Sequence, residues 1–338
     1  MSLLPFLHRV SSGEHLSSAD AHCAMSVILE GGASDATLAG FLVALRMKGE
    51  TAAELAGFAQ AMRERSIFVD AGEDVIDTCG TGGDGAGTFN ISTVAALVMA
   101  GAGARVAKHG NRSISNTGGG SAELFHALGV CFEMTPEQAA RAVREIGIGF
   151  LFAPSLHPAM KHAQPVRREL KMRTVFNLLG PLANPARARR QLIGAPSAVA
   201  ARLMAEALAE LGTEHALVVH GHDGLDEIST TDATDVYEVR TGRADRHMWS
   251  PEDFGVKRAA LSDLKGGDPS RNAEIASEIL AGSAGPRREI VLVNAAAGLM
   301  VAGLAADLKS AMAKAAESID SGAAADRLQQ LRKKFPAK

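Results

Sequence analysis

The sequence predicts an α/β fold, with a small all-helical domain and a larger domain whose mainly parallel sheet is flanked by helices. Three observations carry this prediction. Apolar residues recur at helical spacing through residues 1–69. From about residue 74, short apolar runs alternate with glycine-rich turns and helical stretches, as is typical of a parallel sheet. A basic, helix-like segment at 161–182 interrupts that alternation.

The N-terminal part is predicted to contain helices only. Alanine, leucine and methionine repeat at helical spacing in 38–47 and again in 52–65. Ser18 and Ser34 precede helical patterns and are predicted as N-caps. The first 16 residues lack the order of a secretory signal peptide.

Five apolar runs are predicted as strands of the larger domain: 75–79, 104–108, 148–152, 216–219 and 289–293. Ligands of parallel sheets bind at the carboxyl ends of the strands, so we expect the functional site at the turns that follow these runs. The apolar stretch 295–306 is too short to cross a bilayer and is predicted as a buried helix. The tail, 311–338, is predicted as a charged surface helix.

The basic segment is expected to cross back to the helical domain. The predicted small domain is therefore 1–69 plus about 163–184, and the large domain is 70–162 plus 185–338.

Composition excludes several function classes. A net charge of −3 and only one Trp and one Tyr argue against broad affinity for nucleic acid or membranes. Cys23, Cys79 and Cys131 are far apart and form no C-x-x-C pair, so neither a disulfide framework nor a zinc site is predicted. We expect a protein of the reducing cytoplasm.

The loop after the first predicted strand has the features of an anion cradle. Five glycines fall between Gly80 and Gly87, and a helix is predicted to begin at about Ile91. Glycines allow close approach of the backbone to a ligand, and a helix N-terminus adds unpaired N–H groups and a positive dipole end. The loop fits G-x-G-x-x-G, but no acidic residue between Asp84 and Glu123 completes a dinucleotide motif, and no G-K-[ST] completes a P-loop. We interpret it as a phosphate or pyrophosphate cradle; the alternative is a tight turn.

A second loop, 108–121, follows the next predicted strand. Lys108 and Arg112 can neutralise phosphate charge, and Ser121 with Glu123 is predicted to cap the next helix. The alternative is an exposed basic turn.

Acidic and basic side chains stand near these loops. The adjacent Asp226 and Glu227 follow a predicted strand and suit Mg²⁺ bridged to a pyrophosphate, although such pairs also occur by chance. Arg167 begins a basic run that is either a solvated helix face or a binding site for a substrate carboxylate. His157 and His162 are interpreted as structural or surface residues.

Seven segments, in order over most of the chain, resemble the anthranilate phosphoribosyltransferases of tryptophan biosynthesis. They are GTGGD at 80–84, NIST at 90–93, KHGNR at 108–112, HPAM at 157–160, VRREL at 166–170, NLLGPL at 177–182 and DGLDEIS at 223–229. The resemblance implies a small helical and a larger α/β domain with a hinge between them, and a homodimer formed through the helical part. It also implies transfer of the 5-phosphoribosyl group of phosphoribosyl pyrophosphate (PRPP) to the amine of anthranilate with Mg²⁺, the second step from chorismate.

The resemblance also implies a set of site residues. The residues implied for PRPP are Gly80, Gly83, Asp84, Thr88, Asn90, Ser92, Thr93, Lys108, Asn111, Arg112, Ser115 and Ser121. Those for anthranilate are Gly80, Asn111 and Arg167, and those for magnesium are Ser92, Asp226 and Glu227. The residues implied in catalysis are Lys108, His109 and Arg167.

One stretch departs from the family pattern. Residues 116–120 read NTGGG, one residue longer than the family, and their Thr-Gly-Gly is similar to the pyrimidine nucleoside phosphorylases. A phosphorylase of that kind is therefore an alternative function. A non-catalytic relative that binds nucleic acid is a second alternative, but neither a basic charge balance nor a degraded phosphate loop supports it.

Overall fold

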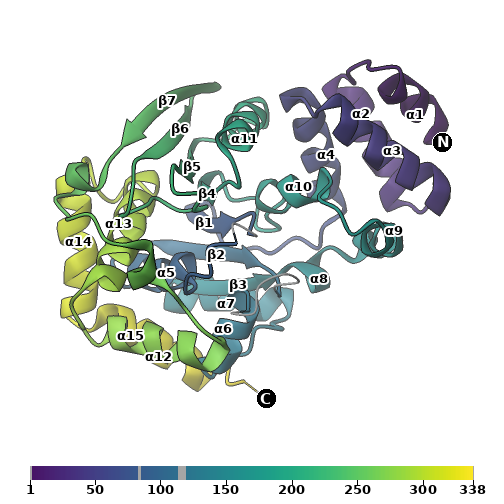
Figure 1. Ribbon diagram of the computed structural model, residues 1–338. Coiled ribbons are helices and arrows are strands. Elements are labelled where there is room, and N and C mark those ends of the chain that lie inside the picture. Colours follow the sequence, from purple (N-terminus) through teal and green to yellow (C-terminus); the bar gives the residue numbers. More distant parts are fainter. Residues whose placement is uncertain (1, 83–84, 113–118, 338) are drawn as a thin grey trace.

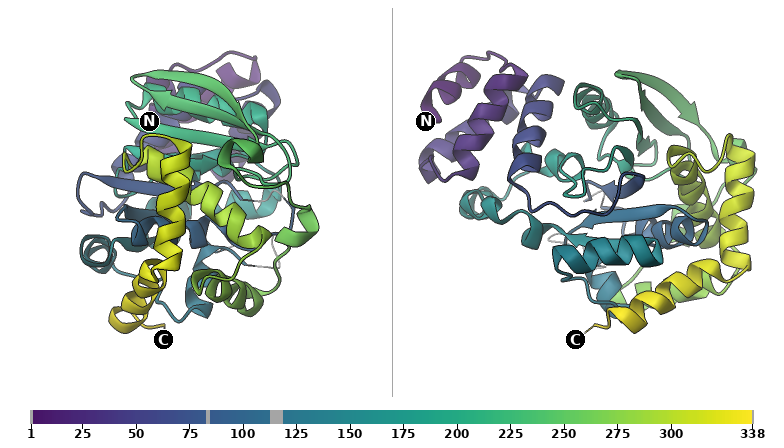
Figure 2. Two further views of the ribbon diagram at one scale, coloured as in Figure 1. Left: turned by 90° about the vertical axis from the view of Figure 1, so that its left-hand side faces the viewer. Right: turned by 180° about the vertical axis from the view of Figure 1, so that it is seen from behind.

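The structure is a computed structural model that describes residues 2–82, 85–112 and 119–337. Two lobes make up the molecule, and Figures 1 and 2 show them from three sides. The small lobe is helical and carries the N-terminus, whereas the large lobe contains one sheet flanked by helices. The predicted fold class is confirmed.

The N-terminal helices of the small lobe are α1 (Leu4–Ser11), α2 (Ser18–Leu29), α3 (Asp35–Lys48) and α4 (Ala52–Arg65). A side-chain cap starts each of them except α1. Ser34 caps α3 as predicted. The predicted cap at Ser18 is wrong, because Ser17 keeps the extended backbone of an N-cap and its hydroxyl accepts from the backbone N–H of Asp20, while Ser18 is already helical. A cap of this kind stabilises a helix by about 1 kcal/mol.

The basic segment packs against two helices of the small lobe. α9 (Gln164–Leu170) packs on α3, and α10 (Phe176–Leu182) packs on α4. The segment is not one helix, however. A 3₁₀ turn, η1 (Pro158–His162), precedes α9, and the chain breaks at Lys171, which has a φ of 48°. Periodicity alone does not show these breaks.

Seven strands form a single sheet in the order β3-β2-β1-β4-β5-β6-β7. They are β1 (Val75–Gly80), β2 (Arg105–Gly110), β3 (Ile148–Phe152), β4 (Arg190–Gly194), β5 (His215–Gly221), β6 (Thr234–Arg240) and β7 (Arg243–Trp249). The first five are parallel, and β6 and β7 add an antiparallel edge. The carboxyl ends of β1, β2, β4 and β5 therefore meet at one edge.

Four of the five strand predictions are confirmed, for 75–79, 104–108, 148–152 and 216–219. The fifth is wrong, because 289–293 lies inside α13 (Pro286–Val301), a helix that is buried along nearly its whole length. A short apolar run in a buried helix has the same pattern as a buried strand. The predicted buried helix is confirmed for 295–301.

Helices cover both faces of the sheet (Figure 2). α13 and α5 (Ile91–Gly101) pack on one face, and α11 (Ala198–Glu210) packs on the other, where it also meets α4. The alternation along β4 and β5 follows from this arrangement: Leu192 and Leu217 join the first core, and Ile193 and Val218 join the second. The second core continues into the small lobe, so α11 and the sheet anchor that lobe.

The remaining helices complete the large lobe. They are α6 (Ser121–Ala127), α7 (Pro136–Ile146), α8 (Ala153–Leu156), η2 (Pro251–Phe254), η3 (Leu261–Leu264), α12 (Pro269–Leu280), α14 (Leu308–Asp320) and α15 (Ala323–Lys334). The predicted single tail helix is thus two helices, separated at Gly322, whose φ is 79°. Over the described residues, no helix has both the length and the apolar character needed to cross a bilayer.

Candidate active site

Glycines end four neighbouring parallel strands, and the following loops cross directly over them. A Cβ on Gly80, at the end of β1, would lie 2.7 Å from the Asp226 carboxylate, and one on Gly194, at the end of β4, would lie 1.7 Å from the Asp226 carbonyl oxygen. The same holds for Gly110 against the Ser121 hydroxyl, at 2.3 Å. Only residues without a side chain let the loops approach the sheet edge this closely.

The acidic pair is held by backbone N–H groups of the first glycine loop and of the helix after it. Asp226 Oδ2 accepts from the N–H of Gly82 at 2.9 Å, and Glu227 Oε1 accepts from the N–H of Ser92 at 3.2 Å. Ser92 is in the first turn of α5, where N–H groups lack intrahelical partners. The pair therefore lies at the helix end that favours negative charge.

A small cavity of about 10 Å³ lies at this point, and its lining includes Gly80, Ser92, Asp226 and Glu227. This volume matches a single water molecule or ion. The hydroxyl and two carboxylates are hard oxygen donors of the kind that Mg²⁺ prefers. No third His, Cys, Asp or Glu joins a metal-binding group among the described residues. The donor set fits Mg²⁺, which commonly keeps several waters and binds substrate oxygens alongside one or two carboxylates.

Asn294 of α13 clamps the loop that carries the acidic pair. It is 1% exposed, its Oδ1 accepts from the N–H of Ile228 at 3.0 Å, and its Nδ2 donates to the Ile228 carbonyl at 2.9 Å. Both backbone groups of the residue after Glu227 are thus satisfied by one side chain. Asn294 has no local sequence signal, because it is 66 residues away from its partner and belongs to no motif.

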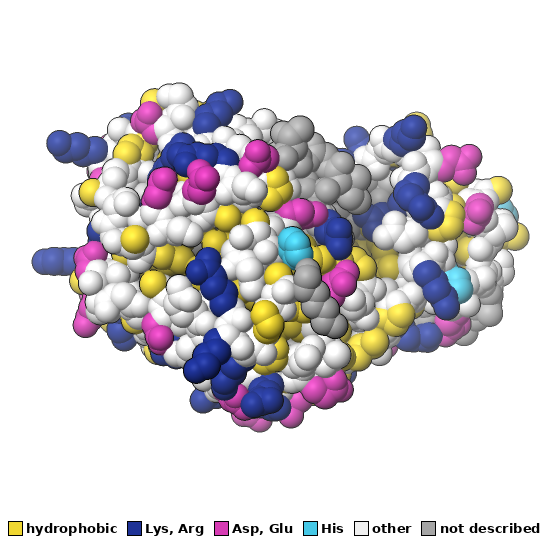
Figure 3. All heavy atoms as spheres, turned by 90° about the horizontal axis from the view of Figure 1, so that it is seen from below, with side chains coloured by type: hydrophobic (Ala, Val, Ile, Leu, Met, Phe, Trp, Pro, Cys, Tyr) yellow, Lys and Arg dark blue, Asp and Glu magenta, His cyan; other side chains and the backbone are white. Residues whose placement is uncertain are grey.

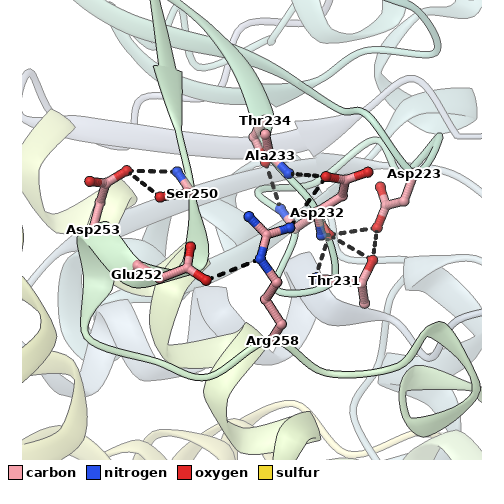
Figure 4. A network of polar contacts seen from close by, with 10 residues as sticks. Asp223, Thr231, Asp232, Ala233, Thr234, Ser250, Glu252, Asp253 and Arg258 are labelled. Atoms are coloured by element: carbon pink, nitrogen blue, oxygen red, sulfur yellow. Dashed lines mark hydrogen bonds and ion pairs between the residues drawn. The ribbon is translucent and has the colours of Figure 1, made fainter.

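The outer side of the same loop forms a second polar network, shown in Figure 4. Asp223 accepts from the hydroxyls of Ser229 and Thr231 and, at 3.2 Å, from the N–H of Leu225. Arg258 lies between Asp232 and Glu252. The acidic pair is therefore presented by a loop that is held from inside and from outside.

We expect the substitution Asn294→Leu to lower the free energy of unfolding by about 2–4 kcal/mol, because it leaves two buried backbone groups without partners. We also expect it to raise the Mg²⁺ concentration needed for half-maximal rate several-fold, since the acidic pair loses its support. Urea unfolding and initial rates against Mg²⁺ measure these effects. Ser318→Ala removes another buried hydrogen bond, to Val98, and serves as the control. An equal rise in the Mg²⁺ concentration for half-maximal rate in both variants would show that Asn294 has no specific role in supporting the acidic pair.

Lys108 connects β2 to the acidic pair through Ser92. It is 2% exposed, and its ammonium donates to the Thr78 carbonyl and, at 3.3 Å, to the Ser92 hydroxyl. Burial lowers the pKa of Lys108, and neighbouring acidic groups, among them Glu227, act in the opposite direction. The ammonium therefore lies beneath Ser92 and orients its hydroxyl at the small cavity.

His109 is buried beside a second histidine. Its Nδ1 lies 3.1 Å from the Gly180 carbonyl, and its ring centroid lies 5.2 Å from that of His157. The Nε2 atoms of both rings are buried without a hydrogen-bond partner among the described residues. Burial lowers the pKa of His109 to about 3 and that of His157 to about 4. Both rings are thus neutral at pH 7, whereas His162 is exposed.

These histidines predict a pH dependence of stability. In the unfolded chain the two histidines are protonated below a pH of about 6.5. In the folded protein their pKa values are about 3 and about 4, so they are protonated only near those pH values. Below pH 6.5 the unfolded state therefore holds more protons than the folded state. The free energy of unfolding falls as the pH is lowered, by about 1.4 kcal/mol per pH unit for each histidine. The buried Asp77, whose pKa burial raises to about 6, acts in the opposite direction between about pH 4 and 6.

We expect the slope of unfolding free energy against pH, between pH 4.5 and 6, to be about 2–2.5 kcal/mol per unit smaller in His109→Gln/His157→Gln than in the wild type. Urea unfolding at four pH values measures both slopes, and groups common to the two proteins cancel. Equal slopes would show that the two rings are not neutral in the folded state.

The second loop is joined to the first through Asn90. Its Nδ2 donates to the Gly119 carbonyl at 3.2 Å, and Asn272 of α12 donates to its Oδ1 at 3.2 Å. The predicted helix start at Ser121 is confirmed, but the N-cap is Gly120 rather than Ser121, with Glu123 accepting from the Gly120 N–H. The Ser121 hydroxyl faces Gly110 instead.

Other residues implied for the site are more scattered. Thr88 forms an isolated bridge with Lys265, and Thr93 is buried at the start of α5. The Arg112 guanidinium lies 4.8 Å from the ring centre of Phe132. The Asn111 side chain accepts from the N–H of Arg112 at 2.7 Å. Gly83, Asp84, Ser115 and the departure at 116–118 lie outside the described residues.

Arg167 of α9 is half-buried, and its guanidinium lies 5.1 Å from the ring centre of Phe176. Burial lowers its pKa. Arg168, the next residue, is exposed. Arg167 packs with the small lobe, whereas Gly80 and Asn111 lie in the large lobe. Among the described residues, no hydrogen bond or ion pair joins Arg167 to Gly80 or Asn111. Figure 3 shows a hollow between the lobes with basic and acidic side chains around it.

Comparisons with known proteins match both lobes. The description "Glycosyl transferase family, helical bundle domain" matches residues 4–66, and "Glycosyl transferase family, a/b domain" matches 72–325. The anthranilate phosphoribosyltransferase of Solibacter usitatus is 60% identical over 98% of each chain, and that of Anaeromyxobacter sp. is 53% identical over 96% of each.

Solved structures agree with these relatives. The anthranilate phosphoribosyltransferase of Thermus thermophilus superposes with a TM-score of 0.91 at 43% identity, covering 98% of this chain and 99% of its own. The Saccharomyces cerevisiae enzyme in complex with PRPP and Mg superposes with a TM-score of 0.89 at 31% identity, covering 98% and 97%. A second structure of the yeast enzyme contains 4-fluoroanthranilate, with a TM-score of 0.86 at 30% identity, covering 98% and 96%.

Proposed function

The chain belongs to the anthranilate phosphoribosyltransferases, and we propose that its reaction takes place at the glycine-ended edge of the sheet. The enzyme transfers the 5-phosphoribosyl group from PRPP to the amine of anthranilate, giving N-(5-phosphoribosyl)anthranilate and pyrophosphate, in tryptophan biosynthesis. The observation that carries the proposed location is the hydrogen bonding of Asp226 and Glu227 to N–H groups of the glycine loop and of α5.

Loss of anthranilate fluorescence, followed with and without PRPP and Mg²⁺, tests the reaction itself. Turnover that needs both supports it. Turnover of thymidine with phosphate would instead favour a nucleoside phosphorylase, and salt-dependent binding of DNA without turnover would favour a non-catalytic relative. The relatives favour the transferase over both alternatives.

We assign Mg²⁺ to Ser92, Asp226 and Glu227. The hard oxygen donors and the ion-sized cavity support this assignment, and a yeast relative is described with Mg. When bound, the ion neutralises charge on the departing pyrophosphate. Lys108 acts through Ser92, whose hydroxyl it holds at 3.3 Å, so in this conformation it positions a ligand of the ion.

The two loops are proposed to bind PRPP from both sides. Backbone N–H groups of the first loop and of the α5 N-terminus are suited to phosphate oxygens, and Asn90 links them to Gly119 of the second loop. The proposed contacts remain Gly80, Gly83, Asp84, Thr88, Asn90, Ser92, Thr93, Lys108, Asn111, Arg112, Ser115 and Ser121.

The acceptor needs positioning more than activation. An anilinic amine is already neutral at pH 7, so no strong base is required, and catalysis comes largely from holding two substrates in register. His109 agrees with this view, because burial lowers its pKa to about 3 and so makes it a weak base. Gly80, Asn111 and Arg167 are proposed to bind anthranilate, with the guanidinium on its carboxylate.

We expect Arg167→Ala to raise the KM for anthranilate by about 10–100-fold, the equivalent of losing a charge-assisted hydrogen bond of about 1.5–3 kcal/mol. The KM for PRPP should change less than about threefold. Steady-state kinetics with each substrate varied in turn measures both. Arg168→Ala removes the same charge from the exposed neighbour and is the matched control. Equal increases in the two KM values of Arg167→Ala would refute the role.

The assembly is proposed to be a homodimer formed through the small lobe. Leu4 of α1 is 48% exposed and Met47 of α3 is 83% exposed, and both belong to that lobe. The division into 1–69 plus 163–184 and 70–162 plus 185–338 is supported by the packing of α9 and α10 on α3 and α4. Three free cysteines agree with a cytoplasmic location.

A further inference from the structure

A larger cavity, of about 290 Å³, lies between the lobes, and we call it the interlobe cavity. Its lining includes Arg46, Glu50, Thr81, Gly82, Arg173 and Thr174. It shares no residue with the small cavity beside the acidic pair, and none of the three residues proposed for the acceptor lines it. Neither the proposed chemistry nor the family motifs therefore account for its charged side chains.

Two hydroxyls of the interlobe cavity are buried without a hydrogen-bond partner among the described residues. They are Oγ1 of Thr81, which follows β1, and Oγ1 of Thr174, which precedes α10. Thr174 is only 5% exposed. A buried polar group without a partner is destabilising, so both hydroxyls gain from a ligand that supplies a hydrogen bond. They come from opposite lobes, and a ligand that reaches both spans the gap.

Charged groups of both signs line the same cavity. Arg46, near the end of α3, donates to the Arg173 carbonyl through one nitrogen, and its guanidinium has further N–H donors. Glu50 follows α3 and is partly buried. Guanidiniums bind carboxylates well, and a carboxylate accepts from an amine. Leu178 and Pro196 add apolar surface.

We propose that the interlobe cavity is a second ligand site, for a small molecule that carries both a carboxylate and an amine. The carboxylate binds the guanidiniums of Arg46 and Arg173 and the Thr174 hydroxyl, and the amine donates to Glu50. Two kinds of molecule have this chemistry: an aminobenzoate, which resembles the acceptor, and a free α-amino acid. Because the ligand contacts Thr81 and Gly82 of the glycine loop as well as the small lobe, its binding is coupled to that of PRPP.

Crystals of the wild-type protein soaked with 5-bromoanthranilate locate one ligand class directly, by the anomalous signal of bromine. The proposal expects a peak in the interlobe cavity, whether or not a second peak lies near Arg167. Soaks with 4-bromophenylalanine test the α-amino acid class in the same way. Absence of both ligands from the interlobe cavity at saturating concentration overturns the proposal.

Calorimetry on matched variants tests the chemistry of recognition. Thr174→Val removes the hydroxyl at nearly constant shape and is expected to weaken the bound class at least fivefold, whereas Thr174→Ser keeps the hydroxyl and is expected to retain its affinity. Glu50→Gln should weaken an amino carboxylate but not benzoate, which has no amine. Affinities unchanged in both Thr174→Val and Glu50→Gln overturn the proposal.

The outcome is separable from that of the proposed function, on which this inference rests for the identity of PRPP. PRPP-dependent turnover of anthranilate reports on the active site, and the location and variant effects of the soaked ligand report on the interlobe cavity. Turnover without a ligand in the interlobe cavity leaves the proposed function intact and removes only this second site.

Discussion

The double substitution Asp226→Asn with Glu227→Gln is expected to lower kcat/KM by about 10²–10⁴-fold at about 1 mM Mg²⁺, equivalent to about 3–5 kcal/mol of transition-state stabilisation. Each amide keeps an oxygen that can accept from the N–H of Gly82 or Ser92, the bonds that hold the wild-type side chains. The loop therefore has the means to stay in place while the site loses two negative charges. We further expect the Mg²⁺ concentration for half-maximal rate to rise more than about 10-fold.

Initial rates over a Mg²⁺ titration, with circular dichroism to confirm the fold, measure this effect. Asp232→Asn with Glu252→Gln removes the same charge from an exposed pair on the outer side of the molecule, where both side chains contact Arg258 (Figure 4). This control should retain the wild-type Mg²⁺ dependence. An unchanged titration in the Asp226/Glu227 variant would exclude the pair as metal ligands.

Local sequence patterns predicted most of the sheet and the position of the site. Glycines at the ends of apolar runs indicated the edge of the sheet at which the loops after β1 and β2 begin. A close approach of backbone to backbone needs a residue without a side chain. The same reasoning located the acidic pair at the end of β5. In the structure the pair is hydrogen-bonded to the first glycine loop and to α5, which lie 144 and 135 residues earlier in the chain.

Other features depend on tertiary structure and have no local signal. The run 289–293 was predicted as a strand because a helix buried on all sides loses its polar face, and with it the periodicity that distinguishes the two. β4, β6 and β7 were not predicted, and β4 lies at the centre of the sheet beside β1. Its placement there brings Gly194 to the site.

The exact first residue of a helix also depends on tertiary structure and not on residue type alone. Ser17 and Ser18 are equally good caps by residue type, and only the extended backbone at Ser17 decides between them. Asn294 is a stronger case, since its role depends on α13 placing one buried amide beside Ile228. No spacing within the sequence encodes that pairing.

Gly194→Ala is expected to abolish most activity, with a loss of about 10²-fold or more in kcat/KM. A Cβ at this position would lie 1.7 Å from the carbonyl oxygen of Asp226 and 2.6 Å from its carbonyl carbon. Both contacts are with backbone, so no side-chain rotation relieves them. β4 cannot retreat, because Gly194 pairs with Gly80 of β1 on one side and with Val219 of β5 on the other. The loop must therefore shift, and Asp226 and Glu227 shift with it.

Overpacking of this kind costs about 1–3 kcal/mol of stability, which a protein of ordinary stability tolerates, so the variant should fold and lose function. Circular dichroism and a Mg²⁺ titration of the rate separate the two effects. Gly180→Ala is the matched control, because a Cβ there meets nothing within 4 Å. Wild-type kcat/KM in Gly194→Ala would mean that the acidic pair acts without its close contact to the sheet edge, and the proposed site would then have to be abandoned.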